Sequence, residues 1–114
     1  MKTSELQGAA LDWAVATCEE ELDEQDYYIH ESTGAFMLER GEVSWVYSPS
    51  TNWSQGGPII EREKITVGPN PFGIEFIANV RDIDMYGPTL LIAAMRCYVT
   101  SKLGDEVEIP EAMK

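Results

Sequence analysis

The sequence predicts an α/β (α+β) sandwich: a small, mostly antiparallel sheet with about three helices packed on it. Apolar residues recur at helical spacing near both ends of the chain, and they alternate with polar residues in its middle. The length of 114 residues leaves little room for a second core. We therefore expect one domain that spans residues 1–114.

Three helical regions are predicted. The first spans Ser4 to Glu21 and has a wide apolar face. Ser50 or Thr51 caps a second region, which continues from Pro58 to Lys64 as one kinked helix or two short ones. The third starts at Pro88 and ends just before Gly104, because proline favours the start of a helix and glycine the position just after its end.

The strands are predicted between these helices. Phe36 to Glu39 and Val43 to Tyr47 form a hairpin around Arg40-Gly41-Glu42. The second of these strands alternates large apolar residues with others, so we expect one of its faces to be buried. Gly73 to Arg81 is a further strand, and Glu106 to Ile109 is a short edge strand.

The chain is strongly acidic, with 20 acids, 8 bases and a net charge of −12. This balance argues against direct binding of nucleic acid and against binding to an anionic membrane. Seven acids and no base lie between Glu19 and Glu31. This acidic run is either a solvated loop or a mimic of nucleic-acid charge that blocks a DNA-binding protein.

Two features of the sequence indicate a cytoplasmic protein. Cys18 and Cys97 have no cysteine neighbour at metal-ligand spacing, so we expect reduced, buried thiols. The N-terminus lacks the apolar stretch of a signal peptide, and no apolar run approaches the ~20 residues that span a bilayer.

The candidate site lies in the polar run from Tyr47 to Glu63. We expect this run to turn from a strand into a helix, and a helix start leaves backbone N–H groups free for an anion. Trp53 offers a flat face for stacking a base. Arg62 or Arg96 would supply a charged fork for a phosphate. Hydrogen bonds and close backbone approach would come from Ser50, Thr51, Asn52, Gln55, Gly56 and Gly57.

A purely structural interpretation of the same run stays open. Helix caps and turns use the same small hydroxyl and amide residues, a Gly-Gly pair also lets two helices cross closely, and Trp53 would then belong to the core.

Catalysis is not expected. The single histidine, His30, has no second histidine or cysteine nearby to share a metal, and no nucleophile elbow or zinc-protease motif occurs. We therefore expect a non-enzymatic protein without a metal or cofactor.

Three blocks of sequence cover about half of the chain: Met1 to Ala16, Tyr47 to Arg62 and Pro88 to Pro110. These blocks resemble the NinX-like family of small phage proteins of unknown function, whereas Gly68 to Tyr86 matches no known family. The last two blocks are also distantly similar to phage ABA-sandwich domains. The resemblance implies a phage accessory protein made in the host cytoplasm, and it supplies no catalytic residues.

Two hypotheses follow. The first is a homo-oligomeric binding protein that sequesters a small nucleotide-like ligand, such as a host anti-phage defence signal. The alternative is an acidic inhibitor or DNA mimic, in which the run from Glu19 to Glu31 blocks a host defence protein.

Overall fold

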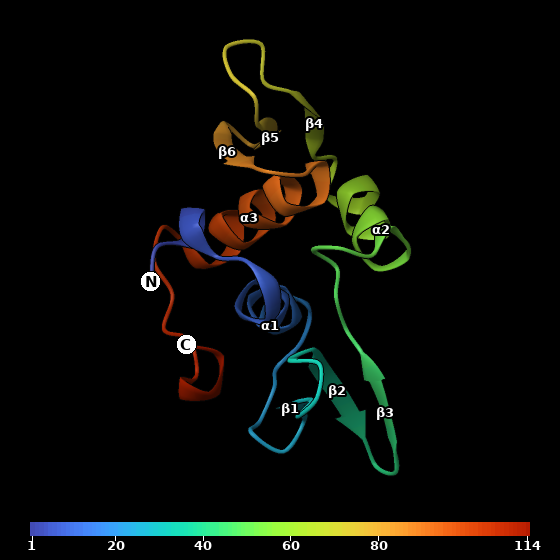
Figure 1. Cartoon of the computed structure of the whole chain (residues 1–114). Helices are drawn as coiled ribbons and strands as arrows, with labels where there is room; N and C mark the ends of the chain where they lie inside the picture. The colour runs from blue at the N-terminus through green and yellow to red at the C-terminus, as the bar shows by residue number, and fades with distance from the viewer.

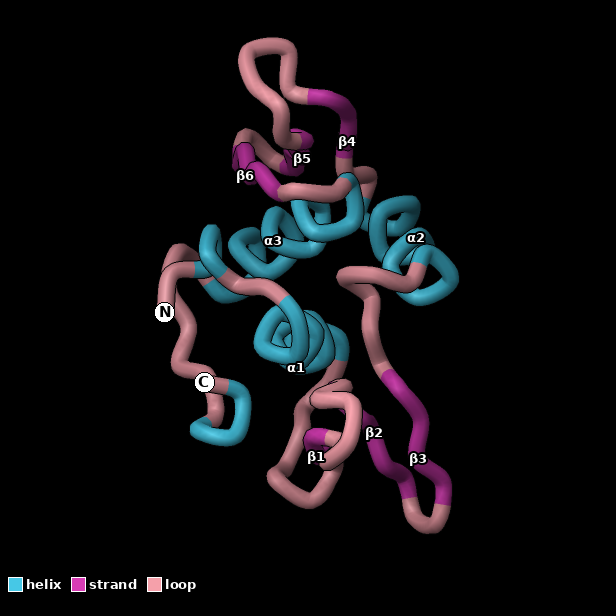
Figure 2. The backbone as a smooth tube through the Cα atoms, viewed as in Figure 1, coloured by secondary structure: helices cyan, strands magenta, loops and turns pink.

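The structure is a computed structural model that describes all residues from 1 to 114. Helices occupy the middle of the molecule and a three-stranded antiparallel sheet lies toward each end (Figure 2). The α+β class, the antiparallel pairing and the three main helices are confirmed. The strands form two sheets, however, where one was expected, and the molecule is elongated, at 45 × 26 × 25 Å.

The N-terminal helix is shorter than predicted. A 3-10 turn, η1 (Thr3–Glu5), is followed by a break, and helix α1 runs over Gly8–Glu19. The break has two causes: the Leu6 carbonyl accepts a hydrogen bond from Arg96, and Gly8 adopts a left-handed φ of 58°. The helix therefore cannot start at Ser4.

The first sheet contains β1 (Tyr27–Ile29), β2 (Phe36–Arg40) and β3 (Val43–Val46), in that order. The β2–β3 hairpin was predicted. In contrast, β1 was not predicted, because it lies within the acidic run from Glu19 to Glu31. The buried strand is β2, and all four residues of β3 are exposed. Of the buried face expected over Val43 to Tyr47, only Tyr47 packs against the core, because β3 is an edge strand.

Helix α2 (Trp53–Glu63) is one helix that contains Pro58, which resolves the choice left open by the sequence. The second sheet follows, with β4 (Thr66–Pro69), β5 (Phe76–Val80) and β6 (Ile83–Gly87) in sequence order. Of these only β5 was predicted, with bounds that were too wide.

Helix α3 (Leu90–Leu103) lies at the centre and packs on β5, β6 and α1 (Figure 1). Its buried residues share one core with α1, α2 and the second sheet, while Phe36 and Leu38 of β2 belong to a small separate core. The chain ends in a 3-10 turn, η2 (Glu111–Met113), and the expected edge strand is reduced to a bridge between Lys2 and Glu106. No helix has the length and apolar character required to cross a bilayer.

Candidate functional site

A pocket of about 370 Å³ lies where the loop before α2 meets the start of α3. Four of its seven lining residues are apolar, and the other three carry hydroxyl groups. The lining residues are Ser50, Thr51, Trp53, Phe76, Thr89, Leu90 and Leu91. Its volume falls at the lower end of the range for small-molecule sites, roughly 300–1,000 Å³.

Two helices begin at this pocket. Asn52 caps α2 by accepting a hydrogen bond from the Ser54 amide at 2.9 Å, and Thr89 caps α3 by accepting from the Ile92 amide at 3.1 Å. The Trp53, Leu90 and Leu91 amides donate no hydrogen bond within the chain. Free amides at a helix start carry partial positive charge, so these helix starts suit an anionic group.

The loop before α2 offers fewer free amides than the sequence suggested. The Thr51 and Asn52 amides both donate to the Ser48 carbonyl, at 3.0 and 2.8 Å. The Ser50 amide donates to the Asp12 carboxylate at 2.9 Å. The available donors are therefore at the two helix starts rather than along the loop.

Ser50 is a buried polar residue of the pocket whose hydroxyl lacks a regular hydrogen-bond partner. It is only 1% exposed, and its hydroxyl makes no hydrogen bond of normal geometry. A buried polar group without a partner typically costs ~1–3 kcal/mol. The nearby group that can partly satisfy this hydroxyl is the Asp12 carboxyl, whose pKa the hydroxyl lowers.

Asp12 lies directly behind Ser50 and was not recognised from the sequence. Burial raises the pKa of this carboxyl to about 6, although the Ser50 amide and the nearby Ser50 hydroxyl lower it in part. Its side chain forms no ion pair and connects α1 to the loop before α2. The charged form is therefore disfavoured in the folded protein.

Asp12→Asn should stabilise the protein at neutral pH, because asparagine keeps the acceptor for the Ser50 amide without a buried charge. A folded-state pKa above the unfolded value means that stability is highest at low pH and is lost as the pH rises to about 6. The shift corresponds to about 3 kcal/mol at most, at about 1.4 kcal/mol per pKa unit. Urea unfolding of both proteins from pH 4 to pH 8 measures this gain, which should vanish near pH 4.

Gly56 and Gly57 have different roles. A Cβ atom on Gly56 would lie 2.3 Å from the Pro49 carbonyl oxygen and 2.7 Å from a Leu91 methyl group. The same atom on Gly57 would meet only the Trp53 ring, at 3.8 Å. Gly56 thus permits the close approach of α2, its preceding loop and α3, as the structural interpretation proposed.

Asn52 and Gln55, which were expected to bind the ligand, do not line the pocket. The Asn52 side chain is engaged in the helix cap. The Gln55 side chain accepts from the Ser48 amide at 2.7 Å and donates to the Val46 carbonyl at 3.0 Å. These bonds hold the loop that carries Ser50 and Thr51.

Neither predicted arginine lies at the pocket. Arg96 is 8% exposed, and its guanidinium donates to the Leu6 and Tyr86 carbonyls, each at 2.8 Å. Arg62, in the last turn of α2, forms two hydrogen bonds to Glu19 and a third to Tyr98. Burial opposes ionisation of Glu19, but the hydrogen bonds from Arg62 and Tyr98 outweigh it and lower the pKa of that carboxyl.

The family model described as Bacteriophage P22, NinX matches residues 2–102 of the 114-residue chain. The chain belongs to the NinX family. The NinX match includes every residue that lines the pocket. It also extends through residues 68–86, a segment in which the sequence alone showed no resemblance to the family. No curated protein sequence matches the chain.

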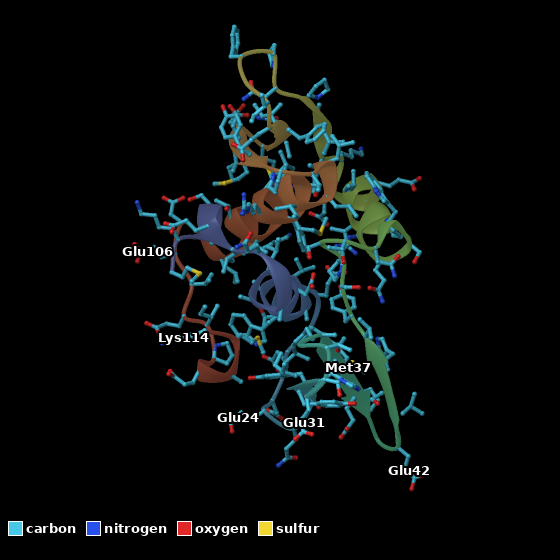
Figure 3. All side chains as sticks on the ribbon, in the orientation of Figure 1. Glu24, Glu31, Met37, Glu42, Glu106 and Lys114 are labelled. Carbon is cyan, nitrogen blue, oxygen red and sulfur yellow. The ribbon has the colours of Figure 1, made fainter.

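In this NinX-family chain, the acidic run is partly neutralised. Glu20 and Asp26 both pair with Arg40, and Glu19 pairs with Arg62. Glu24 and Glu31 lie with Glu42 at the end of the molecule that carries the first sheet (Figure 3). Glu24 and Glu31 are exposed and therefore face solvent far from the second sheet.

The pocket contains residues that the sequence analysis did not assign to a site. Thr89, Leu90 and Leu91 start the one helix whose N-terminus was predicted most closely, and Phe76 begins β5. The sequence did indicate that a helix starts at Pro88-Thr89, which places Thr89 at a helix N-terminus. Nothing in the sequence indicated that this start would meet the start of α2.

Proposed function

We propose that this NinX-family phage protein binds and sequesters a small nucleotide-like ligand in the pocket between the starts of α2 and α3, without catalysis. The observation that carries the proposal is the meeting of two helix starts, with free amides, beside the exposed ring of Trp53. A base would stack on Trp53 and a phosphate would accept from the amides of Leu90 and Leu91.

This arrangement changes how a phosphate would be recognised. No guanidinium lines the pocket, so backbone amides replace the arginine fork that the sequence suggested. The hydroxyls of Thr51 and Thr89 add hydrogen-bonding groups for a sugar. Apolar contact with Phe76 and Leu91 would exclude water from the bound ring.

Calorimetric titration with AMP, ADP-ribose and cyclic di-AMP tests the proposal. We expect saturable binding of at least one of them, and mass spectrometry after denaturation should recover the ligand unaltered. A chemically changed ligand would indicate an enzyme instead. Absence of binding across all three would contradict the proposal.

Trp53→Ala should weaken that binding roughly 5- to 150-fold, because stacking on an aromatic side chain contributes ~1–3 kcal/mol per base. The side chain is 53% exposed, so we expect the thermal unfolding midpoint to change little. Trp45→Ala is the matched control, since Trp45 is an exposed tryptophan on β3, outside the pocket. Equal losses in the two variants would count against stacking at Trp53.

Asp12 provides a second check through pH. Its ionisation places negative charge behind Ser50, so the affinity for ADP-ribose or cyclic di-AMP, whose phosphates stay charged near pH 6, should rise as the pH falls through about 6. Asp12→Asn should remove that dependence.

The proposal that the chain mimics nucleic-acid charge has less support. Three of the seven acids between Glu19 and Glu31 are paired with arginines of the same chain, and a mimic needs free carboxylates to meet a basic partner. We therefore retain the ligand-binding function as the conclusion.

A further inference from the structure

The loop between β4 and β5 displays two large apolar side chains that contact little of the chain. Phe72 is 96% exposed and Ile74 is 101% exposed, more than any other large hydrophobic residue of the molecule. The loop projects beyond the second sheet at one end of the molecule, at the top of Figure 1. We call residues 70–75 the hairpin tip.

The hairpin tip is held in shape by its own hydrogen bonds. The Asn70 amide donates to the Glu75 carbonyl at 3.0 Å, and the Asn70 side chain accepts from the Phe72 amide at 3.0 Å. An ordered loop loses little conformational entropy on binding. The tip therefore carries Phe72 and Ile74 on an ordered backbone, which suits an interface anchor.

The pocket adjoins the hairpin tip, because Phe76 lines the pocket and directly follows the tip in the chain. None of the 28 charged residues lines the pocket, and Glu75 is the only charged residue of the tip. We call the pocket lining and residues 70–74 the uncharged face. In a chain of net charge −12, two copies meet there with less repulsion than at an acidic surface.

We propose that this face joins two copies of the chain, with the hairpin tip of each copy lying over the pocket of the other. Phe72 and Ile74 of one copy would contact the Trp53 ring and the apolar pocket wall of its partner. A two-fold axis makes the exchange reciprocal, so both tips and both pockets are covered at once. The partner's tip thereby supplies a wall of the candidate ligand site.

A second copy suits this face better than a charged partner. Phe72 and Ile74 of the tip and four of the seven pocket residues are apolar, and both surfaces are open to solvent in the single chain. The contact is built from two loops per copy, so we expect a dimer of roughly micromolar affinity rather than an obligate one.

Sedimentation equilibrium at about 100 µM tests the assembly, a concentration above the roughly micromolar affinity expected. The wild-type chain should show twice the 12.8 kDa mass of one chain, and Phe72→Ser/Ile74→Ser should show a single mass. Both side chains are fully exposed, so circular dichroism should confirm that the double variant still folds. Val43→Ser, a 63% exposed valine on β3, is the control and should remain a dimer. A monomeric wild type, or equal dissociation by Val43→Ser, would overturn the proposal.

A photocrosslinker at position 72 tests where the tip lies. In a mixture of light and isotopically heavy chains, we expect crosslinks between the two kinds of chain that reach residues 50–53 or 89–91. Crosslinks to other surfaces, or none between chains, would refute the arrangement. These readouts need no ligand: a dimer that binds no nucleotide would remove only the proposed function, and a monomer that binds nucleotide would remove only this inference.

Discussion

Gly56→Ala should destabilise the protein by about 3 kcal/mol or more, because the new methyl group would overlap a backbone atom. Its Cβ would lie 2.3 Å from the Pro49 carbonyl oxygen, which cannot move without shifting the loop that carries Ser50 and Thr51. Urea unfolding followed by circular dichroism measures the loss. We expect a lower midpoint with an unchanged slope.

Gly57→Ala is the matched control for that experiment. The added Cβ meets only the Trp53 ring, at an ordinary 3.8 Å. Alanine is favoured over glycine inside a helix by about 1 kcal/mol, so this variant should be as stable as the wild type or slightly more stable. If both variants behave alike, the close crossing at Gly56 is not what holds the pocket together.

Arg96→Met should cost about 3–5 kcal/mol, since it removes two charge-assisted hydrogen bonds and leaves the Leu6 and Tyr86 carbonyls without their donor. Leu6 is fully buried, so water cannot readily replace the guanidinium at its carbonyl. Burial lowers the pKa of Arg96, yet the guanidinium keeps its positive charge at neutral pH. Thermal and urea unfolding measure the effect.

Arg62→Met provides the comparison for Arg96. The Arg62 side chain is 49% exposed, and most of its hydrogen bonds go to the carboxylates of Glu19 and Glu63. Water can reach the site that it would vacate, so its loss should cost about 1 kcal/mol, less than the loss of Arg96. The two arginines looked equivalent in the sequence as phosphate ligands. An equal loss of stability in the two variants would contradict the expectation that buried Arg96 contributes more to stability than exposed Arg62.

Several elements were predictable because their signals are local. The Pro88-Thr89 start and Gly104 end bound α3 within two residues, and the β2–β3 hairpin follows from alternating residues around a Gly41 turn. By contrast, β4 and β6 escaped prediction. Each is a short edge strand whose pairing depends on β5, so its tertiary neighbours decide its conformation.

The candidate site was only partly predictable for a similar reason. Ser50, Thr51 and Trp53 were expected to bind ligand and do line the pocket, whereas the ligand itself remains a prediction. The other wall, at Thr89 to Leu91, comes from a helix about forty residues away in sequence. Spacing along the chain cannot show that two helix starts meet, and it cannot tell a buried structural arginine such as Arg96 from a free one.

The meeting of two helix starts is tested most directly by ¹H–¹⁵N NMR during titration with AMP, ADP-ribose or cyclic di-AMP. We expect saturable shifts of the Trp53, Leu90 and Leu91 amides and of the Trp53 indole N–H, with Gly41 and Glu42 unmoved in the distant hairpin. Saturable shifts confined to other parts of the chain, or none with any of the three compounds, would contradict a ligand site at this pocket.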